Sequence, residues 1–208
     1  MPFCLETDKI QITTQRSLTV DEKKASQAVR DLLTALDIDI TAQGMENTPD
    51  RVAKMYKFLF NGVNRSTADI WGETFTTSSE GVIAVRKIPF YSMCEHHLVP
   101  FFGEVHIAYI PHQGKIAGFS KFTALVNLIA HRPQLQERLT AEIADAVYKD
   151  LGAEGVLVII EAQQLCMTMR GDLAPETRTL TTECRGNLKS GSELYRDARL
   201  LLLKGETE

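Results

Sequence analysis

The chain has 208 residues, of which 44% are hydrophobic, and 23 Lys and Arg against 27 Asp and Glu give a formal net charge of −4. This length suits one domain, or a domain with a helical appendage, and is enough to bury a hydrophobic core. The mildly acidic balance gives no reason to expect nucleic acid or a membrane surface as a partner. No apolar run reaches the length of a membrane span, and the first residues do not have the pattern of a signal peptide.

Residues 1–17 show no clear hydrophobic period and are predicted to be an N-terminal arm. Residues 19–22 (TVDE) have the pattern of a capping box, and apolar residues follow at helical spacing. A second helix is predicted to begin at Thr48-Pro49, with Thr48 as the N-cap and Pro49 at the first helical position. Residues 18–64 are therefore expected to form a helical hairpin.

Residues 65–208 combine strand and helix signals. The predicted strands are residues 82–88, 104–110, 156–162 and 178–183. The predicted helices are residues 120–130 with Ser120 as cap, a longer helix from beyond Pro133 to Leu151, and residues 193–203. Helices first and then strands around a helical pair indicate an α+β architecture.

The four cysteines, at positions 4, 94, 166 and 184, are too scattered for a disulfide framework. A reducing cytoplasm fits this pattern better than an oxidising compartment. We expect Cys4 and Cys184 to be ordinary thiols, which leaves Cys94 and Cys166 as the cysteines with a candidate chemical role.

Cys94, His96 and His97 lie within four residues, in a chain with only four Cys and five His. Cys94 and His97 are three positions apart, so a tight turn or one helical turn brings both to one side. Zn²⁺ takes Cys sulfur and His nitrogen in tetrahedral geometry, and His96 would point elsewhere and be free to exchange protons. The alternative for so short a motif is a buried thiol beside a packed histidine.

Cys166 is the natural candidate for a third ligand. Two Cys and one His leave the fourth position to water, which is typical of a catalytic zinc site. If residues 163–170 are extended, Gln164, Cys166, Thr168 and Arg170 share one face, and the apolar residues between them fill the core on the other. Such a polar face would form the wall of a site.

Five motifs occur in a fixed order along the chain. They are CEHH at 94–97, FFG at 101–103, GFSK at 118–121, RPQLQERLT at 132–140 and CMTMRG at 166–171. Together they resemble the GTP cyclohydrolase I family, and the resemblance runs from about residue 18 to about residue 202. It implies the tunnelling fold for residues 65–208, a catalytic domain whose small antiparallel sheets join with those of other subunits into a barrel. It also implies a decamer of two stacked five-membered rings, with sites at subunit boundaries.

The resemblance implies a reaction as well. The family opens the imidazole ring of GTP at C8, releases formate and recloses the product as 7,8-dihydroneopterin triphosphate. It assigns Zn²⁺ to Cys94, His97 and Cys166. His96 would exchange protons, and Glu137, with Gln136 beside it, would hold the guanine.

Further residues are expected at the substrate, most of them as cations for the triphosphate. They are Ser120, Lys121, Arg170 and, from an adjacent subunit, Arg51 and Lys54. Spacing alone leaves Arg51 and Lys54 as part of a solvated helix face. The resemblance instead turns them toward the phosphates of a neighbouring site.

Two positions depart from the family pattern. Gln164 stands where the family has a His, two residues before the second zinc Cys, and glutamine cannot exchange a proton near neutrality. Ala124 stands where the family has an Arg, four residues after Ser120, so one charge-assisted phosphate contact is missing. Both changes bear on catalysis, at the acid catalyst and at the phosphate grip.

Three hypotheses follow from this combination. The first is a zinc hydrolase acting at C8 of GTP, with slower turnover or with a neighbouring group replacing the missing acid. The second is an enzyme for a guanine nucleotide or nucleoside with fewer phosphates, or one that stops at the ring-opened formamide. The third is a ring of subunits that binds zinc and a purine nucleotide without turnover.

Overall fold

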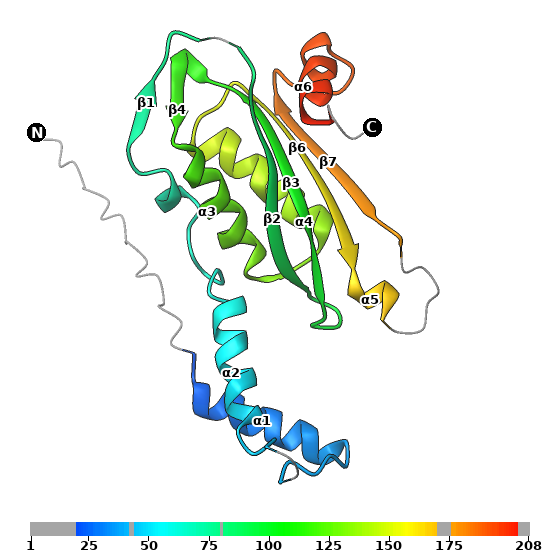
Figure 1. The fold of residues 1–208 in the computed structure, drawn as a ribbon. Helices are drawn as coiled ribbons and strands as arrows, with labels where there is room; N and C mark the ends of the chain where they lie inside the picture. Colours follow the sequence, from blue (N-terminus) through cyan, green and yellow to red (C-terminus); the bar gives the residue numbers. More distant parts are fainter. Residues whose placement is uncertain (1–19, 42–43, 80, 170–175, 204–208) are drawn as a thin grey trace, which may run out of the picture.

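The computed structural model describes residues 20–41, 44–79, 81–169 and 176–203 (Figure 1). The predicted arm at residues 1–17 and the candidate Arg170 lie outside these ranges. Among the described residues, no helix is long and apolar enough to cross a membrane.

The N-terminal helices α1 (Glu22–Ala35) and α2 (Thr48–Leu59) form the predicted hairpin. They are joined by a hydrogen bond of 2.6 Å from Ser26 Oγ to Asp50 Oδ1. The predicted caps are wrong at both helices, because Asp21 caps α1 by accepting from Lys24 N, and α2 takes Asn47 as its N-cap with Thr48 already helical. In each case another polar residue one or two positions away occupies the cap.

The main sheet has five strands in the order β5-β2-β3-β6-β7. Its members are β2 (Ile83–Cys94), β3 (Pro100–Ile110), β5 (Pro133–Gln134), β6 (Gly155–Gln164) and β7 (Thr179–Gly186). All pairings are antiparallel except β5 with β2. A second, two-stranded sheet pairs β1 (Thr74–Thr76) with β4 (Lys115–Ala117).

Strand β2 extends six residues beyond its predicted end at Ile88, to Cys94. The register with β3 shifts between Val85 and Ile88, and Lys87 in this interval has a φ of 55°. Such a bulge interrupts the alternation of side chains, so a prediction that relies on period two stops there. The extension matters because it brings Cys94 to the end of the strand.

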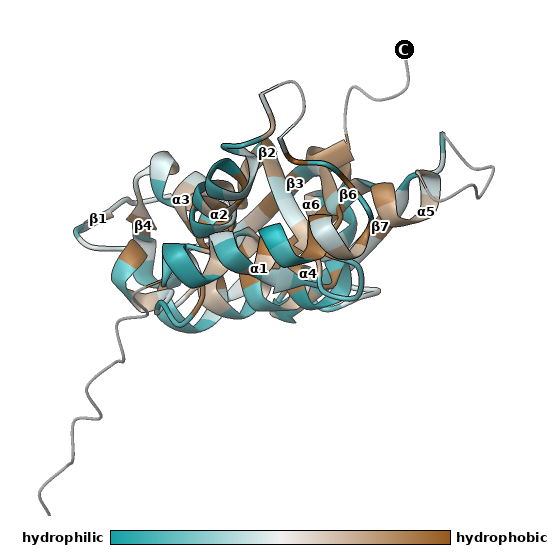
Figure 2. Cartoon of the chain, turned by 90° about the horizontal axis from the view of Figure 1, so that it is seen from below, coloured by the Kyte–Doolittle hydropathy of each residue, from teal (hydrophilic) through white to brown (hydrophobic). Residues whose placement is uncertain are grey.

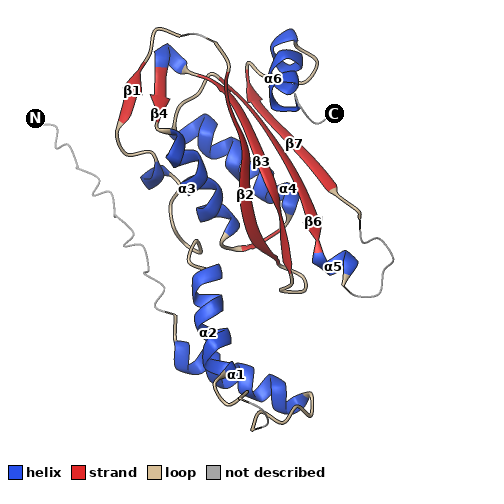
Figure 3. Ribbon diagram, viewed as in Figure 1, coloured by secondary structure: helices blue, strands red, loops and turns tan. Residues whose placement is uncertain are grey.

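Helices cover both faces of the sheet, as Figure 3 shows. On one face lie α3 (Phe119–Ala130) and α4 (Gln136–Asp145), and α4 continues as a π-helical turn to Asp150. On the other face, α6 (Glu193–Leu203) packs near one end of the strands. The sheet therefore has a hydrophobic core on each face. Neighbouring residues of β3 point to opposite faces, so Ile107 packs in the core under α3 and α4, and Ala108 packs in the core under α6.

The hairpin joins the rest of the chain at Gly62, beyond the end of α2. Helix α2 itself stops at Leu59. A Cβ at Gly62 would lie 1.9 Å from Leu128 O of α3. Glycine is required here because two backbone segments approach closely.

Candidate metal centre and nucleotide pocket

A tight turn follows β2 and carries two of the predicted metal ligands. Leu98 N donates to Cys94 O over 2.8 Å, and Cys94 N donates to Val99 O over 2.9 Å. This closure brings Cys94 Sγ to 3.8 Å from His97 Nδ1, as their spacing predicts. His96 points outward, with its side chain 64% exposed.

Cys166 reaches the same place from a different element. The prediction that residues 163–170 are extended is wrong, because β6 ends at Gln164 and Leu165–Thr168 form one helical turn, α5. Met167 and Met169 are therefore 38% and 62% exposed and do not fill the core. Cys166 still lies half-buried against the core and faces the β2 turn.

The three predicted ligands fit a zinc ion. Ligand atoms of Cys94, His97 and Cys166 all lie within 4.8 Å of one another. Tetrahedral zinc with bonds of about 2.0–2.3 Å separates its ligand atoms by roughly 3.3–3.8 Å. Cys94 is buried whereas His97 is exposed, so the group opens toward solvent on one side. Two sulfurs and one nitrogen therefore leave room for a fourth, exchangeable ligand.

A pocket of about 220 Å³ lies beside this group. Its lining combines the two cysteines, polar residues and a carboxylate: Cys94, His96, Gln134, Leu135, Gln136, Glu137, Gln164, Cys166, Met167, Thr179 and Thr181. Glu137 lies in the first turn of α4 and is exposed, so its carboxylate is available to a ligand. The pocket thus places an exposed carboxylate next to the candidate metal ligands.

Gln164 is held by an internal network. Its Nε2 donates to Gln136 Oε1 over 2.7 Å and, more weakly, to Thr179 Oγ1 over 3.5 Å. Because the nitrogen of this side-chain amide is engaged, its oxygen, Oε1, is the acceptor that the amide retains. The side chain therefore presents a fixed acceptor to the pocket, where an imidazole would present an exchangeable proton.

Gln136 is more enclosed than its predicted role requires. It is 4% exposed, and its Nε2 donates to Ile160 O, Thr179 O and Thr181 Oγ1. Its Oε1 accepts from Thr179 Oγ1 over 2.5 Å as well as from Gln164. These bonds fix the start of α4 on β6 and β7, which in turn fixes Glu137.

The geometry of this end of the sheet agrees with the results of sequence comparison. A family profile described as GTP cyclohydrolase I matches residues 25–201. The chain belongs to the GTP cyclohydrolase I family. The match covers most of α1, all of α2 and every strand of the main sheet.

Individual relatives carry the same description. GTP cyclohydrolase 1 of Streptococcus mutans is 49% identical, over 83% of this chain and 90% of the relative. That of Carboxydothermus hydrogenoformans is 48% identical, over 80% of this chain and 87% of the relative. That of Halalkalibacterium halodurans is 45% identical, over 89% of this chain and 98% of the relative.

The described residues predicted to bind the triphosphate do not line this pocket. Ser120 and Lys121 lie in the first turn of α3, and Ser120 is not its cap, because Gly118 takes that position. Arg51 and Lys54 are exposed on α2. Within one chain of this cyclohydrolase-family protein, the structure therefore brings together the predicted metal and base residues and leaves these four apart.

Sequence reasoning missed several residues that build the site. Thr179 and Thr181 alternate along β7 and both reach Gln136, which their spacing in the predicted strand could have indicated. Arg138 was also missed, although it lies in the QERLT motif. It donates to the Glu95 carboxylate, and this hydrogen bond holds the pKa of Glu95 below its ordinary value.

Proposed function

We propose that this protein is a hydrolase of the GTP cyclohydrolase I type, which converts GTP to 7,8-dihydroneopterin triphosphate and formate in pterin biosynthesis. The observation that carries the proposal is the grouping of Cys94, His97 and Cys166 beside a pocket that Glu137 lines. Sequence identity of 45–49% to relatives named GTP cyclohydrolase 1 supports the same activity.

Several side chains in and beside the pocket have a chemical task in this reaction. Cys94, His97 and Cys166 would hold Zn²⁺, which when bound supplies Lewis-acid activation of water near neutral pH. Glu137 accepts hydrogen bonds from the N–H groups of guanine, and Leu135 and Met167 give the base an apolar wall. His96 lines the same pocket and carries protons to and from the ring nitrogens.

Gln164 leaves the site without one of the proton-exchanging side chains of the family pattern. General acid–base assistance is typically worth ~10²–10⁴-fold in rate, and an amide cannot provide it. The bond from Gln164 to Gln136 gives the residue a structural task instead. His96 is then the residue of this pocket left to move protons.

A second candidate function rests on the same two departures from the family. Gln164 is fixed as an acceptor, and Ala124 leaves an exposed, uncharged position on α3 near Ser120 and Lys121. Both features favour an enzyme for a guanine nucleotide with fewer phosphates, or one that stops at the ring-opened formamide. A nucleotide-binding ring without turnover is the remaining possibility.

One experiment separates these functions. The zinc-loaded protein is incubated with GTP, GMP and guanosine, and products are followed by formate release, pterin fluorescence and mass. Formate together with pterin from GTP supports the first function, and ring opening without pterin, or a preference for GMP or guanosine, supports the second. Binding without any product would overturn both and leave the binding ring.

Gln164→His tests the role given to the missing acid. If the first function holds, the substitution restores an exchangeable proton and raises turnover of GTP, by up to ~10²-fold. Gln163→His is the matched control, because side chains alternate along β6 and Gln163 faces away from Gln164. Equal turnover in both variants and the unaltered protein would contradict the role assigned to position 164.

The site is proposed to be completed by neighbouring subunits, in a decamer built on the tunnelling fold. Apolar side chains on the hairpin remain open in the single chain, with Leu36 60% and Phe58 61% exposed, and Figure 2 shows hydrophobic and hydrophilic residues side by side there. Strand β7 also leaves one edge of the sheet unpaired among the described residues. Light scattering in solution tests the oligomer directly.

Three further predictions complete this proposal, on domains, location and partners. The chain is divided into an arm at 1–17, a helical region at 18–64 and a catalytic domain at 65–208. The enzyme is placed in the cytoplasm, where a reducing environment keeps Cys94 and Cys166 as thiols for metal. Neither nucleic acid nor a membrane is expected as a partner.

A further inference from the structure

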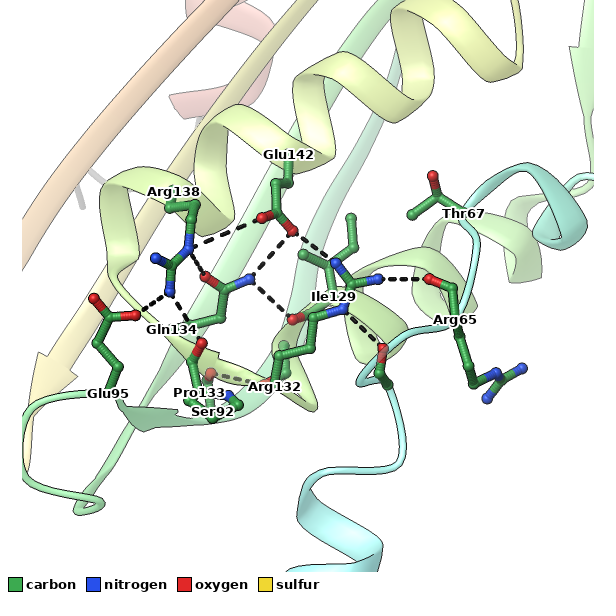
Figure 4. A network of polar contacts seen from close by, with 12 residues as sticks. Arg65, Thr67, Ser92, Glu95, Ile129, Arg132, Pro133, Gln134, Arg138 and Glu142 are labelled. Carbon is green, nitrogen blue, oxygen red and sulfur yellow. Dashed lines mark hydrogen bonds and ion pairs between the residues drawn. The ribbon is translucent and has the colours of Figure 1, made fainter. Parts of the chain in front are cut away.

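Arg138 connects three segments around the turn at residues 94–99, called the metal turn below because it carries Cys94 and His97 (Figure 4). Its Nε donates to Gln134 Oε1 over 2.8 Å, and its Nη2 donates to Pro133 O over 3.0 Å. The same Nη2 donates to the carboxylate of Glu95, the residue directly after Cys94. One guanidinium therefore links the first turn of α4, strand β5 and the turn that carries the metal ligands.

Glu95 is held at both its backbone and its side chain. Glu95 N donates to Gln134 O over 3.1 Å, while the carboxylate accepts from Arg138. Cys94 pairs with Gln134 in the parallel ladder of β2 and β5. With Glu95 fixed in this way, the direction in which the chain leaves Cys94 toward His97 is set.

The partners of Arg138 are themselves immobilised. Gln134 is 1% exposed, and its Nε2 donates to Ile129 O over 3.2 Å and to Glu142 Oε2 over 3.3 Å. Glu142 Oε2 also accepts from Arg132, whose Nε donates to Gly62 O over 2.9 Å. Figure 4 shows this network running from the metal turn to the segment after α2. Arg138 therefore ties Glu95 to a rigid platform.

We propose that Arg138 is a positioning residue for the metal centre, acting through Glu95 to hold Cys94 and His97 in ligating geometry. Arg138 does not line the pocket, so the proposal gives it no contact with substrate. It rests on the proposed zinc site. Partners in the outer shell of metal sites typically change metal affinity by about 10–100-fold when removed, because they orient the ligands.

Zinc affinity and ligand geometry are the readouts for this role. We would prepare Arg138→Met, Arg138→Lys, Glu95→Gln and the double variant Arg138→Met with Glu95→Gln. Zn²⁺ affinity is measured by competition with a chromophoric chelator, and ligand geometry by the absorption spectrum of the Co²⁺-loaded protein. Arg138→Met is expected to weaken zinc binding by about tenfold or more and to alter the Co²⁺ spectrum.

The other variants separate positioning from general stability. The double variant is expected to lose no more affinity than Arg138→Met alone, because the two residues act as one unit. Arg138→Lys is expected to recover part of the affinity, since a lysine can reach Glu95 but cannot bind Gln134 and Pro133 at the same time. Its conservative change also keeps the test valid if Arg138→Met does not fold.

Arg185→Met is the matched control. Arg185 is also anchored to α4, through Asp145 at 2.6 Å, but at the opposite end of the helix from Arg138. It is expected to lower stability toward urea and to leave zinc affinity unchanged. Zinc bound normally by every Arg138 variant, or weakened equally by Arg185→Met, would overturn this inference alone. No zinc bound by the unaltered protein would overturn the proposed function together with it.

Discussion

The two halves of the predicted site differ in how the chain assembles them. The end of β2, the start of α4 and the α5 turn after β6 bring the candidate metal ligands close together, beside a pocket that Glu137 lines. The cations expected at the triphosphate lie on α2 and at the start of α3 instead. The candidate metal ligands with Glu137, called the metal half below, therefore lie close together within one chain. The residues expected to bind the triphosphate, called the cation half below, are spread over its surface.

The length of α3 shows how far the start of this helix lies from the metal turn. A helix of twelve residues is about 18 Å long. The end of α3, at Ala130, bonds to Ser92 beside the metal turn, whereas Lys121 at its start has its Nζ close to Gly72. The two ends of this helix therefore contact different segments of the chain, about 18 Å apart.

The largest expected effect comes from removing a metal ligand. Cys94→Ser is expected to abolish tight zinc binding and formate release, because it removes one of the two sulfurs. Metal content and formate release from GTP are measured on the purified variant. Cys184→Ser, which changes a half-buried thiol of β7, is expected to keep both. Normal zinc content in Cys94→Ser would disprove the metal centre.

Mixed subunits test whether the two halves come from different chains. A variant with Arg51→Glu and Lys54→Glu keeps the metal half and lacks the cations of the hairpin, so it is expected to lose turnover of GTP. Co-assembled with Cys94→Ser, it is expected to regain about a quarter of the activity, because hybrid rings contain some intact sites. The mixture is assayed before and after co-refolding. No recovery would place both halves in one chain.

Adding charge to the cation half should strengthen it. Ala124→Arg places a guanidinium four residues after Ser120, on the same face of α3. A charge-assisted hydrogen bond of about 1.5–3 kcal/mol would lower the KM for GTP by roughly tenfold or more. Guanosine turnover is the internal comparison, since it has no phosphate and should not change. Asn127→Arg, an exposed position seven residues after Ser120 and so about 10 Å farther along α3, is the matched control.

The smallest expected effect concerns the joint between the hairpin and the sheet. Burial lowers the pKa of His131, whose ring packs edge-on against Phe58. The folded protein thus prefers the neutral ring, so the stabilisation is complete above the unfolded pKa of about 6.5 and decreases as the pH falls below it. His131→Gln should flatten the pH dependence of urea unfolding between about pH 5 and 7. An unchanged slope would contradict this.

Local patterns predicted most of the elements. The final helix at Glu193–Leu203 has the predicted bounds, and the predicted strands lie within β3 and β6 or overlap β2 and β7. The errors occur where tertiary contacts override a local signal. Leu165–Thr168 coils into a helical turn at the end of β6, although its alternating polar and apolar residues favour an extended strand.

The candidate site could be predicted only in part for a related reason. Cys94 and His97 are close in sequence, so their spacing was informative, and the motif order pointed to Cys166. Nothing local indicates that Gln164 bonds to Gln136, or that Arg138 bonds to Glu95, because these partners are 28 and 43 positions apart. Such pairs are defined by the packing of α4 against the sheet.

The amino-acid sequence by itself predicted most of the helices and strands, the candidate donor set Cys94, His97 and Cys166, and the two departures at Gln164 and Ala124. Those features depend on residue type and on short-range spacing, which periodicity and side-chain chemistry control directly. Only the tertiary structure decided that Gln164 is pinned to Gln136 and that the metal turn is fixed by Arg138. It also separated the metal half from the cations, because the direction of α3 and α4 across the sheet sets which distant side chains meet.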